Sequence, residues 1–171
     1  MLPATAVGAC GIINQYGLKM VGGPIGGFMS DKVHKSSAKH IRVGFIVCIV
    51  AMILFLMIPH EMLGSTGKWY IGAACTLLFG AIVFTMRAVF FAPMDEVKVP
   101  TEITGAAMSL ASLVIYLPNS FAYLMYGNFL DRFPGMAGYR IVFGVMIAWA
   151  VIGVFVSSFL IRRIKKHQKE S

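Results

Sequence analysis

The chain alternates between five long apolar runs and four short polar segments. A helix needs roughly 20 apolar residues to cross the hydrocarbon core of a bilayer, and each run is close to that length or longer. Helices are expected because open strands would leave backbone polar groups unpaired in lipid. We therefore predict an all-α membrane protein with five transmembrane helices. The predicted spans are Leu2–Met29, Ile41–Ile58, Trp69–Met94, Ile103–Leu130 and Tyr139–Ile161.

Composition supports this class. Hydrophobic residues make up 58% of the chain and charged residues only 13%, whereas soluble domains carry about 25% charged residues. A soluble domain of this size could not bury so much apolar surface. The net charge of +8 does not indicate nucleic acid, because the basic residues flank the apolar runs. The lipid bilayer is the expected surrounding.

The basic residues also predict the orientation. Ten Lys and Arg residues follow the first, third and fifth spans, against three in the other connections. The positive-inside rule then places the N-terminus outside and residues 162–171 in a cytoplasmic tail. The ten residues are Lys32, Lys35, Lys39, Arg42, Lys98, Arg162, Arg163, Lys165, Lys166 and Lys169. An outside start without a signal peptide leaves open whether the chain is a complete product or part of a longer one.

The first polar segment carries the most specific motif, which runs from Gly27 through Asp31 and Lys32 to Lys35. It resembles the loop motif of the major facilitator superfamily, although the usual glycine near Val33 is missing. In that family the motif joins spans two and three and recurs between spans eight and nine. The number of spans, their orientation and the loop charges resemble spans eight to twelve. The resemblance covers the whole chain and implies a partial C-terminal domain.

The resemblance also implies an activity. Members of the family are secondary transporters, symporters or antiporters, which carry solutes by alternating access. A motif aspartate, here Asp31, contacts the opposite six-helix domain as a conformational latch, together with Gly27, Lys32 and Lys35. That N-terminal half is missing here and would be the partner. The cell inner membrane is the implied location, and no cofactor is implied.

Small residues precede the motif at helical spacing. Gly22 and Gly26, and likewise Gly23 and Gly27, are four residues apart. Such small-x-x-x-small pairs allow two helices to approach closely in a membrane. We expect both pairs to lie in helix contacts.

Lys19 is the charged residue placed deepest in a span. It lies eleven residues before Ser30, which corresponds to about 16 Å along a helix, or half of the hydrocarbon core. A lysine at that depth costs several kcal/mol unless it is paired or hydrated. Gln15 lies one turn away on the same face. Two interpretations remain: Lys19 and Gln15 bind an anionic substrate, or Lys19 pairs with a helix outside this chain.

Arg87 lies about 10 Å from the predicted end of its span. Its side chain could extend to the interface or reach Asp95 or Glu96. We interpret it as a structural charge.

The fourth span carries a polar stripe at helical spacing around Pro118. Tyr116, Asn119 and Tyr123 lie on one face, and the proline removes a backbone hydrogen bond. Kinked helices with polar centres often line transport cavities. Alternatively, Asn119 only compensates for the freed carbonyl. We treat these three residues as candidate substrate ligands.

The other features carry little chemistry. Ile41–Ile58 is apolar all round and is expected to face lipid. No spacing of His or Cys predicts a metal site, and no clustered Ser, His or Asp predicts an intramembrane enzyme. We expect a transporter of a small organic solute, an organic anion or a sugar derivative. The alternatives are a truncated, non-transporting fragment and an accessory subunit that needs a partner half.

Overall fold

The computed structural model describes residues 8–9, 11–58, 65–97 and 99–170. Every regular element in these ranges is helical, so the all-α prediction is confirmed. The chain order is η1 (Ile13–Gly17), α2 (Leu18–Phe28), η2 (Met29–His34), α3 (Ser37–Met57), α4 (Ser65–Ala88), α5 (Pro93–Glu96), α6 (Thr101–Arg132) and α7 (Met136–Glu170).

Four helices are long and apolar enough to cross a membrane: Ser37–Met57, Tyr70–Ala88, Thr101–Arg132 and Met136–Lys166. The predicted first span is helical throughout Ile13–His34, but wide π turns divide it into η1, α2 and η2. Counting this divided helix, the described chain contains the five predicted hydrophobic helices.

One predicted boundary is wrong, and two segments beside the predicted spans are helical. The third span ends at Ala88 rather than Met94, because the chain turns and Pro93 begins the separate helix α5. The polar segment after the first span is helical except at Lys35 and Ser36. The cytoplasmic tail predicted for residues 162–171 continues helix α7 as far as Glu170.

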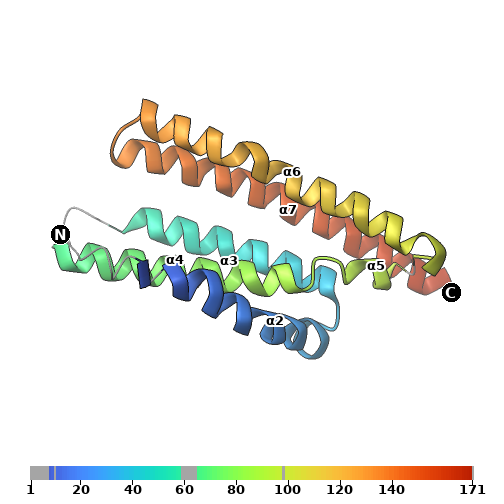
Figure 1. Ribbon diagram of the computed structural model, residues 1–171. Helices are drawn as coiled ribbons and strands as arrows, with labels where there is room; N and C mark the ends of the chain where they lie inside the picture. Colours follow the sequence, from blue (N-terminus) through green and yellow to red (C-terminus); the bar gives the residue numbers. More distant parts are fainter. Residues whose placement is uncertain (1–7, 10, 59–64, 98, 171) are drawn as a thin grey trace.

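The helices form one open layer (Figure 1). Contacts follow the order α6, α7, α3, α4 and α2, so α3 lies in the centre while α2 and α6 form the two edges. Helix α3 packs on both sides, yet large apolar side chains such as Val50, Leu54 and Met57 stay exposed, as expected for a span that faces lipid. Small residues explain the central place of α3, since Ala38 packs with Ile161 and Ile164 of α7.

Glycines set the distance between α2 and α4. A Cβ atom on Gly22 would lie 2.8 Å from the Cβ of Phe84, and one on Gly26 would collide with the Thr85 carbonyl. Nothing lies within 4 Å of such an atom on Gly23 or Gly27. The structure thus confirms the first glycine pair as a helix contact, while the second makes none with the described chain.

Candidate functional site: the junction between α2 and α3

An unusual backbone joins α2 to α3. The chain leaves α2 through the π-helix η2, turns at Lys35 with φ at 52°, and enters α3 from an extended Ser36. π turns are rare and occur often at functional sites. A left-handed lysine is also uncommon and costs of the order of 1 kcal/mol, which its surroundings must offset.

Two buried serines hold this turn closed. Ser30 is 1% exposed and Ser37 is 6% exposed. Their Oγ atoms lie 2.9 Å apart, and the Ser36 amide donates to the Ser30 carbonyl at 3.2 Å. A buried hydroxyl without a partner would cost about 1–3 kcal/mol. The pairing of the two serines therefore stabilises the closed turn.

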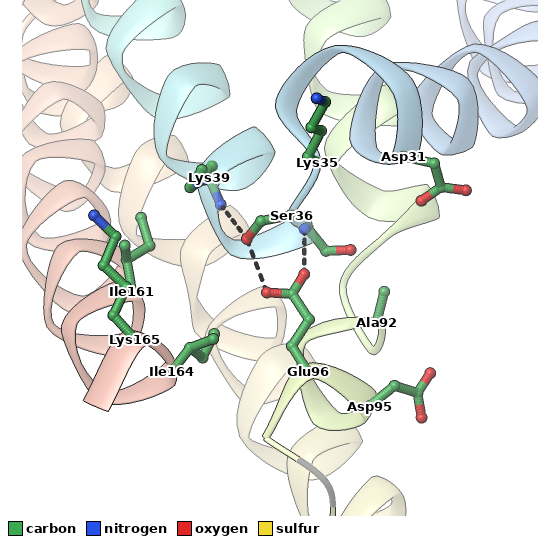
Figure 2. Close-up of a pocket in the computed structure, with 11 residues that line it drawn as sticks. Asp31, Lys35, Ser36, Lys39, Ala92, Asp95, Glu96, Ile161, Ile164 and Lys165 are labelled. Carbon is green, nitrogen blue, oxygen red and sulfur yellow. Dashed lines mark hydrogen bonds between the residues drawn. The ribbon is translucent and has the colours of Figure 1, made fainter. Parts of the chain in front are cut away.

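Glu96 of α5 caps the start of α3 (Figure 2). Its Oε2 atom accepts a hydrogen bond from the Ser36 hydroxyl at 2.8 Å, and its Oε1 atom accepts one from the Ser37 amide. A carboxylate is favourable here because the N-terminus of a helix carries unpaired N–H groups and partial positive charge. Glu96 thus connects the loop after α4 to the junction.

Two histidine rings form the other side of the junction. The Nδ1 atoms of His34 and His40 lie 3.2 Å apart, and the rings meet edge to face with centroids 5.0 Å apart. His34 Nδ1 also lies 3.1 Å from the Met29 carbonyl oxygen. His40 is 4% exposed. The histidines thus link η2 to the first turn of α3.

A hollow of about 500 Å³ opens beside the junction. Figure 2 shows Ser36 and Glu96 at its centre, α7 residues on one side and Asp31 and Asp95 on the other. Charged residues of both signs line it: Asp31, Lys35, Lys39, Asp95, Glu96 and Lys165.

The predicted latch residues belong to this site in part. Asp31 and Lys35 line the hollow, and the exposed Asp31 forms no ion pair with the described part of the chain. Lys32 instead folds back over Phe28, with Nζ 5.4 Å from the ring centroid. Gly27 lies in α2, one turn before Asp31, and a Cβ atom added to it would meet nothing within 4 Å.

Sequence reasoning missed Glu96, Ser30, Ser37 and the histidine pair as parts of this site. One feature of the sequence did single out Glu96. It follows Pro93 and Met94 at the end of an apolar run, and a carboxylate is unfavourable inside a membrane span. No pattern indicated that it would meet Ser36, which lies 60 residues earlier.

The predicted substrate ligands do not converge within this chain. Lys19 is exposed on the edge helix α2, while Tyr116 and Tyr123 are exposed on the opposite edge helix α6. The side chains of Gln15 and Asn119 lie outside the described part of the structure.

Arg87 contacts one of these candidates. Its guanidinium carbon lies 5.9 Å from the centroid of the Tyr116 ring, a cation–π contact between α4 and α6. The Glu96 carboxylate is engaged at Ser36 and Ser37, so it is not the partner of Arg87. Arg87, which the sequence predicted to have a structural role, therefore lies beside Tyr116, a predicted substrate ligand.

Comparison with known proteins shows similarity to bacterial membrane proteins. The chain is 52% identical over 170 residues to "Inner membrane protein YihN" of Escherichia coli (strain K12). The matched region covers 99% of this chain and 39% of YihN. It is 25% identical over 154 residues to "Inner membrane protein YqcE" of the same organism, covering 88% of this chain and 35% of YqcE. The chain therefore spans about two fifths of the length of these relatives.

A third similar protein is an "Uncharacterized protein" of Mycoplasma pneumoniae, 30% identical over 109 residues, which are 58% of this chain and 48% of that protein. No family model matches the chain. No solved structure matches it. The helices and these relatives together identify an all-α, multi-pass membrane protein related to bacterial inner membrane proteins.

Proposed function

We propose that this chain is the C-terminal part of a major facilitator superfamily secondary transporter, and that the α2–α3 junction is its conformational latch. The proposal rests on one observation above all. The residues that resemble the family motif lie where a π-helix, a left-handed lysine and a buried polar network meet. Strained backbone held by buried hydrogen bonds suits an element that switches between two arrangements.

The latch requires a second surface. Asp31 is exposed at the hollow and forms no ion pair with the described residues. An anion at the end of a helix is unfavourable without a donor or a cation. In the proposed transporter the absent N-terminal half supplies that partner, and the contact breaks when the transporter changes the side to which it opens.

Two cation–aromatic pairs support the proposed orientation. Lys32 lies over Phe28 at the end of α2, and Arg163 lies 5.2 Å from the Phe159 ring centroid near the end of α7. Long basic side chains that fold along apolar rings are typical of the membrane interface. These pairs and the lysines of the hollow mark one end of the bundle, which we propose is cytoplasmic. The N-terminus is then outside, in a bacterial inner membrane.

The proposed substrate is a small organic anion or a sugar derivative. Lys19 on α2 supplies one cation, and Arg87 beside Tyr116 supplies a second near α6. Lys19 of α2, Arg87 of α4 and Tyr116 of α6 are all exposed. We propose that the missing half covers these residues and completes the binding cavity, to which Tyr123 also contributes.

The experiment is uptake in a full-length transporter that carries this chain. Cells are tested with a panel of labelled organic anions and sugar phosphates, and Lys19→Gln is compared with Lys68→Gln, the same change in the first turn of α4. We expect Lys19→Gln to lower uptake of the anion at least tenfold at equal protein level, with Lys68→Gln unchanged. Equal uptake by both variants would exclude Lys19 as a ligand.

The alternative is a fragment or accessory subunit that does not transport alone. The coverage of 39% of YihN favours this alternative for the isolated chain. An antibody against residues 161–171 distinguishes the two on an immunoblot of source membranes. A band near 18.6 kDa indicates a separate subunit, and one more than twice as large indicates a whole transporter.

A further inference from the structure

The histidine pair at the junction has a defined arrangement of protons. The Met29 carbonyl can only accept a hydrogen bond, so His34 Nδ1, at 3.1 Å, must carry a hydrogen. That hydrogen also faces His40 Nδ1 at 3.2 Å, which must therefore present its lone pair. His40 is then the neutral tautomer with its hydrogen on Nε2. This Nε2 atom is buried and meets no acceptor with hydrogen-bond geometry in the described structure, and the Thr85 backbone is a polar group that acts on the His40 ring.

This arrangement has no place for a second proton on His40. Protonated His40 would carry N–H on both ring nitrogens, and its Nδ1–H would point at the Nδ1–H of His34 across 3.2 Å. The ring could not turn away freely, because His40 is 4% exposed. As long as His34 keeps its hydrogen bond to the Met29 carbonyl, protonation of His40 therefore requires the two rings to separate, which means that η2 must move away from the first turn of α3.

From this geometry we propose that the His34–His40 pair is a proton-binding site of the α2–α3 junction, where His40 Nδ1 takes one proton from solvent when the junction opens and releases it on closing. The site makes the opening of the junction dependent on pH. The opening itself is a property of this chain, and only its consequence for transport rests on the latch role proposed above.

The other charged groups near the histidine pair do not take the place of His34 beside His40. His34 is the titratable group that acts on His40 from η2. Around the two rings, α2, α3 and α4 supply an almost wholly apolar hollow of about 270 Å³. Arg87, the cation near that end of α4, is exposed and lies against Tyr116. The remaining charged groups of the neighbouring segments are Asp31, Lys32, Lys35, Lys39, Arg42, Asp95 and Glu96.

The direction of the effect follows from where the proton binds. A free imidazole takes up its proton near pH 6.5. Above that pH both the open and the closed junction hold a neutral His40, so the closed state keeps its full stability. Below it only the open state gains the proton, and the equilibrium constant for opening rises about tenfold for each pH unit. Acid therefore opens the junction.

The test is amide hydrogen exchange of the purified chain in lipid nanodiscs between pH 8 and pH 5. Exchange rates are corrected for the intrinsic effect of pH and expressed as protection factors. Amides of Lys35–His40 report the junction, and those of Gly144–Ala150 in the middle of α7 serve as the internal reference. We expect protection at the junction to fall about fivefold between pH 6.5 and pH 5.5, while the reference stays constant.

Three variants locate the proton. His40→Gln removes the titrating ring and should make junction protection independent of pH. His34→Phe removes the opposing N–H, so the dependence on pH should weaken. His167→Gln, the same change in the C-terminal segment, should retain the fall seen in the unchanged chain. Constant protection in the unchanged chain, or an unaltered fall in His40→Gln, would overturn the proposal.

Nitrogen NMR of histidine-labelled protein tests the starting arrangement without any mutation. At pH 8, His40 should show a protonated Nε2 and an unprotonated Nδ1, and His34 a protonated Nδ1. A protonated His40 Nδ1 at pH 8 would overturn the site. Full-length uptake is measured separately: a pH-dependent junction without uptake contradicts only the transporter, and uptake with a pH-independent junction contradicts only the proton site.

Discussion

The α2–α3 junction and helix α6 are both rich in polar residues, yet the chain satisfies them differently. At the junction, Ser30 pairs with Ser37 and Glu96 bonds to the start of α3. On α6, Ser109 and Ser112 bond back to carbonyls of their own helix, and Tyr123 is 78% exposed. The junction residues find their partners within this chain, whereas the tyrosines on the outer face of α6 are exposed.

This difference separates structural from recognition roles. The polar groups of the junction bond to partners from three elements, so they stabilise its local arrangement, and a change in these bonds would alter that arrangement. Polar groups exposed on an edge helix can act only through a ligand or another helix. The junction should therefore respond to mutation in the isolated chain, and α6 should respond mainly in the full-length protein.

The largest effect is expected from Gly26→Leu. The added side chain would collide with the Thr85 carbonyl and with Ala88, so α2 must move away from α4 and take the start of the junction with it. Overpacking of this kind costs about 1–3 kcal/mol or more. Thermal unfolding in detergent, followed by size-exclusion chromatography, should show a clearly lower melting temperature or no folded protein.

Gly27→Leu is the matched control for this change. A Cβ atom at Gly27 meets nothing within 4 Å, so the isolated chain should retain its melting temperature. Equal destabilisation by the two leucines would contradict the packing of α2 on α4.

A smaller effect is expected from Glu96→Ala. The change removes the acceptor of the Ser36 hydroxyl and the Ser37 amide, and loss of a helix cap costs about 0.5–2 kcal/mol. Amide exchange at Ser37 and Ala38 should become faster by roughly two- to thirtyfold, which corresponds to that free energy.

Asp95→Ala serves as the comparison, because the neighbouring Asp95 is exposed and its carboxylate lies away from Ser36 in Figure 2. It should leave exchange at Ser37 unchanged. Faster exchange in Asp95→Ala than in Glu96→Ala would show that the cap has been assigned to the wrong carboxylate.

The smallest effect concerns the link between α4 and α6. Arg87→Gln and Tyr116→Leu, alone and combined, form a double-mutant cycle for the cation–π contact. We expect a coupling free energy of about 0.5–1 kcal/mol, as is usual for an exposed pair. The free energy of unfolding, obtained by denaturant titration, gives this value.

The same cycle with Tyr123→Leu in place of Tyr116→Leu should give no coupling, since Tyr123 is exposed and makes no ring contact with Arg87. Equal coupling for both tyrosines would mean that Arg87 acts on α6 through its charge in general. Either result shows how strongly α6 is coupled to α4 in the folded chain.

Much of the architecture could be predicted from local pattern. The apolar runs predicted the helices because a span needs only length and hydrophobicity. Gly22 and Gly26 were recognisable as a packing face, although the pattern could not distinguish them from Gly23 and Gly27. The end of the third span was misplaced, because the residues between Ala88 and Pro93 are apolar and hide the turn.

The sequence by itself determined that this is a helical membrane protein and which short segment carries its most specific motif. Those properties follow from hydrophobicity, spacing and charge along the chain. Only the tertiary structure decided that α3 is central, that Glu96 caps it, and that His34 and His40 face each other. These are contacts between elements, and their geometry depends on how the helices pack rather than on any local pattern.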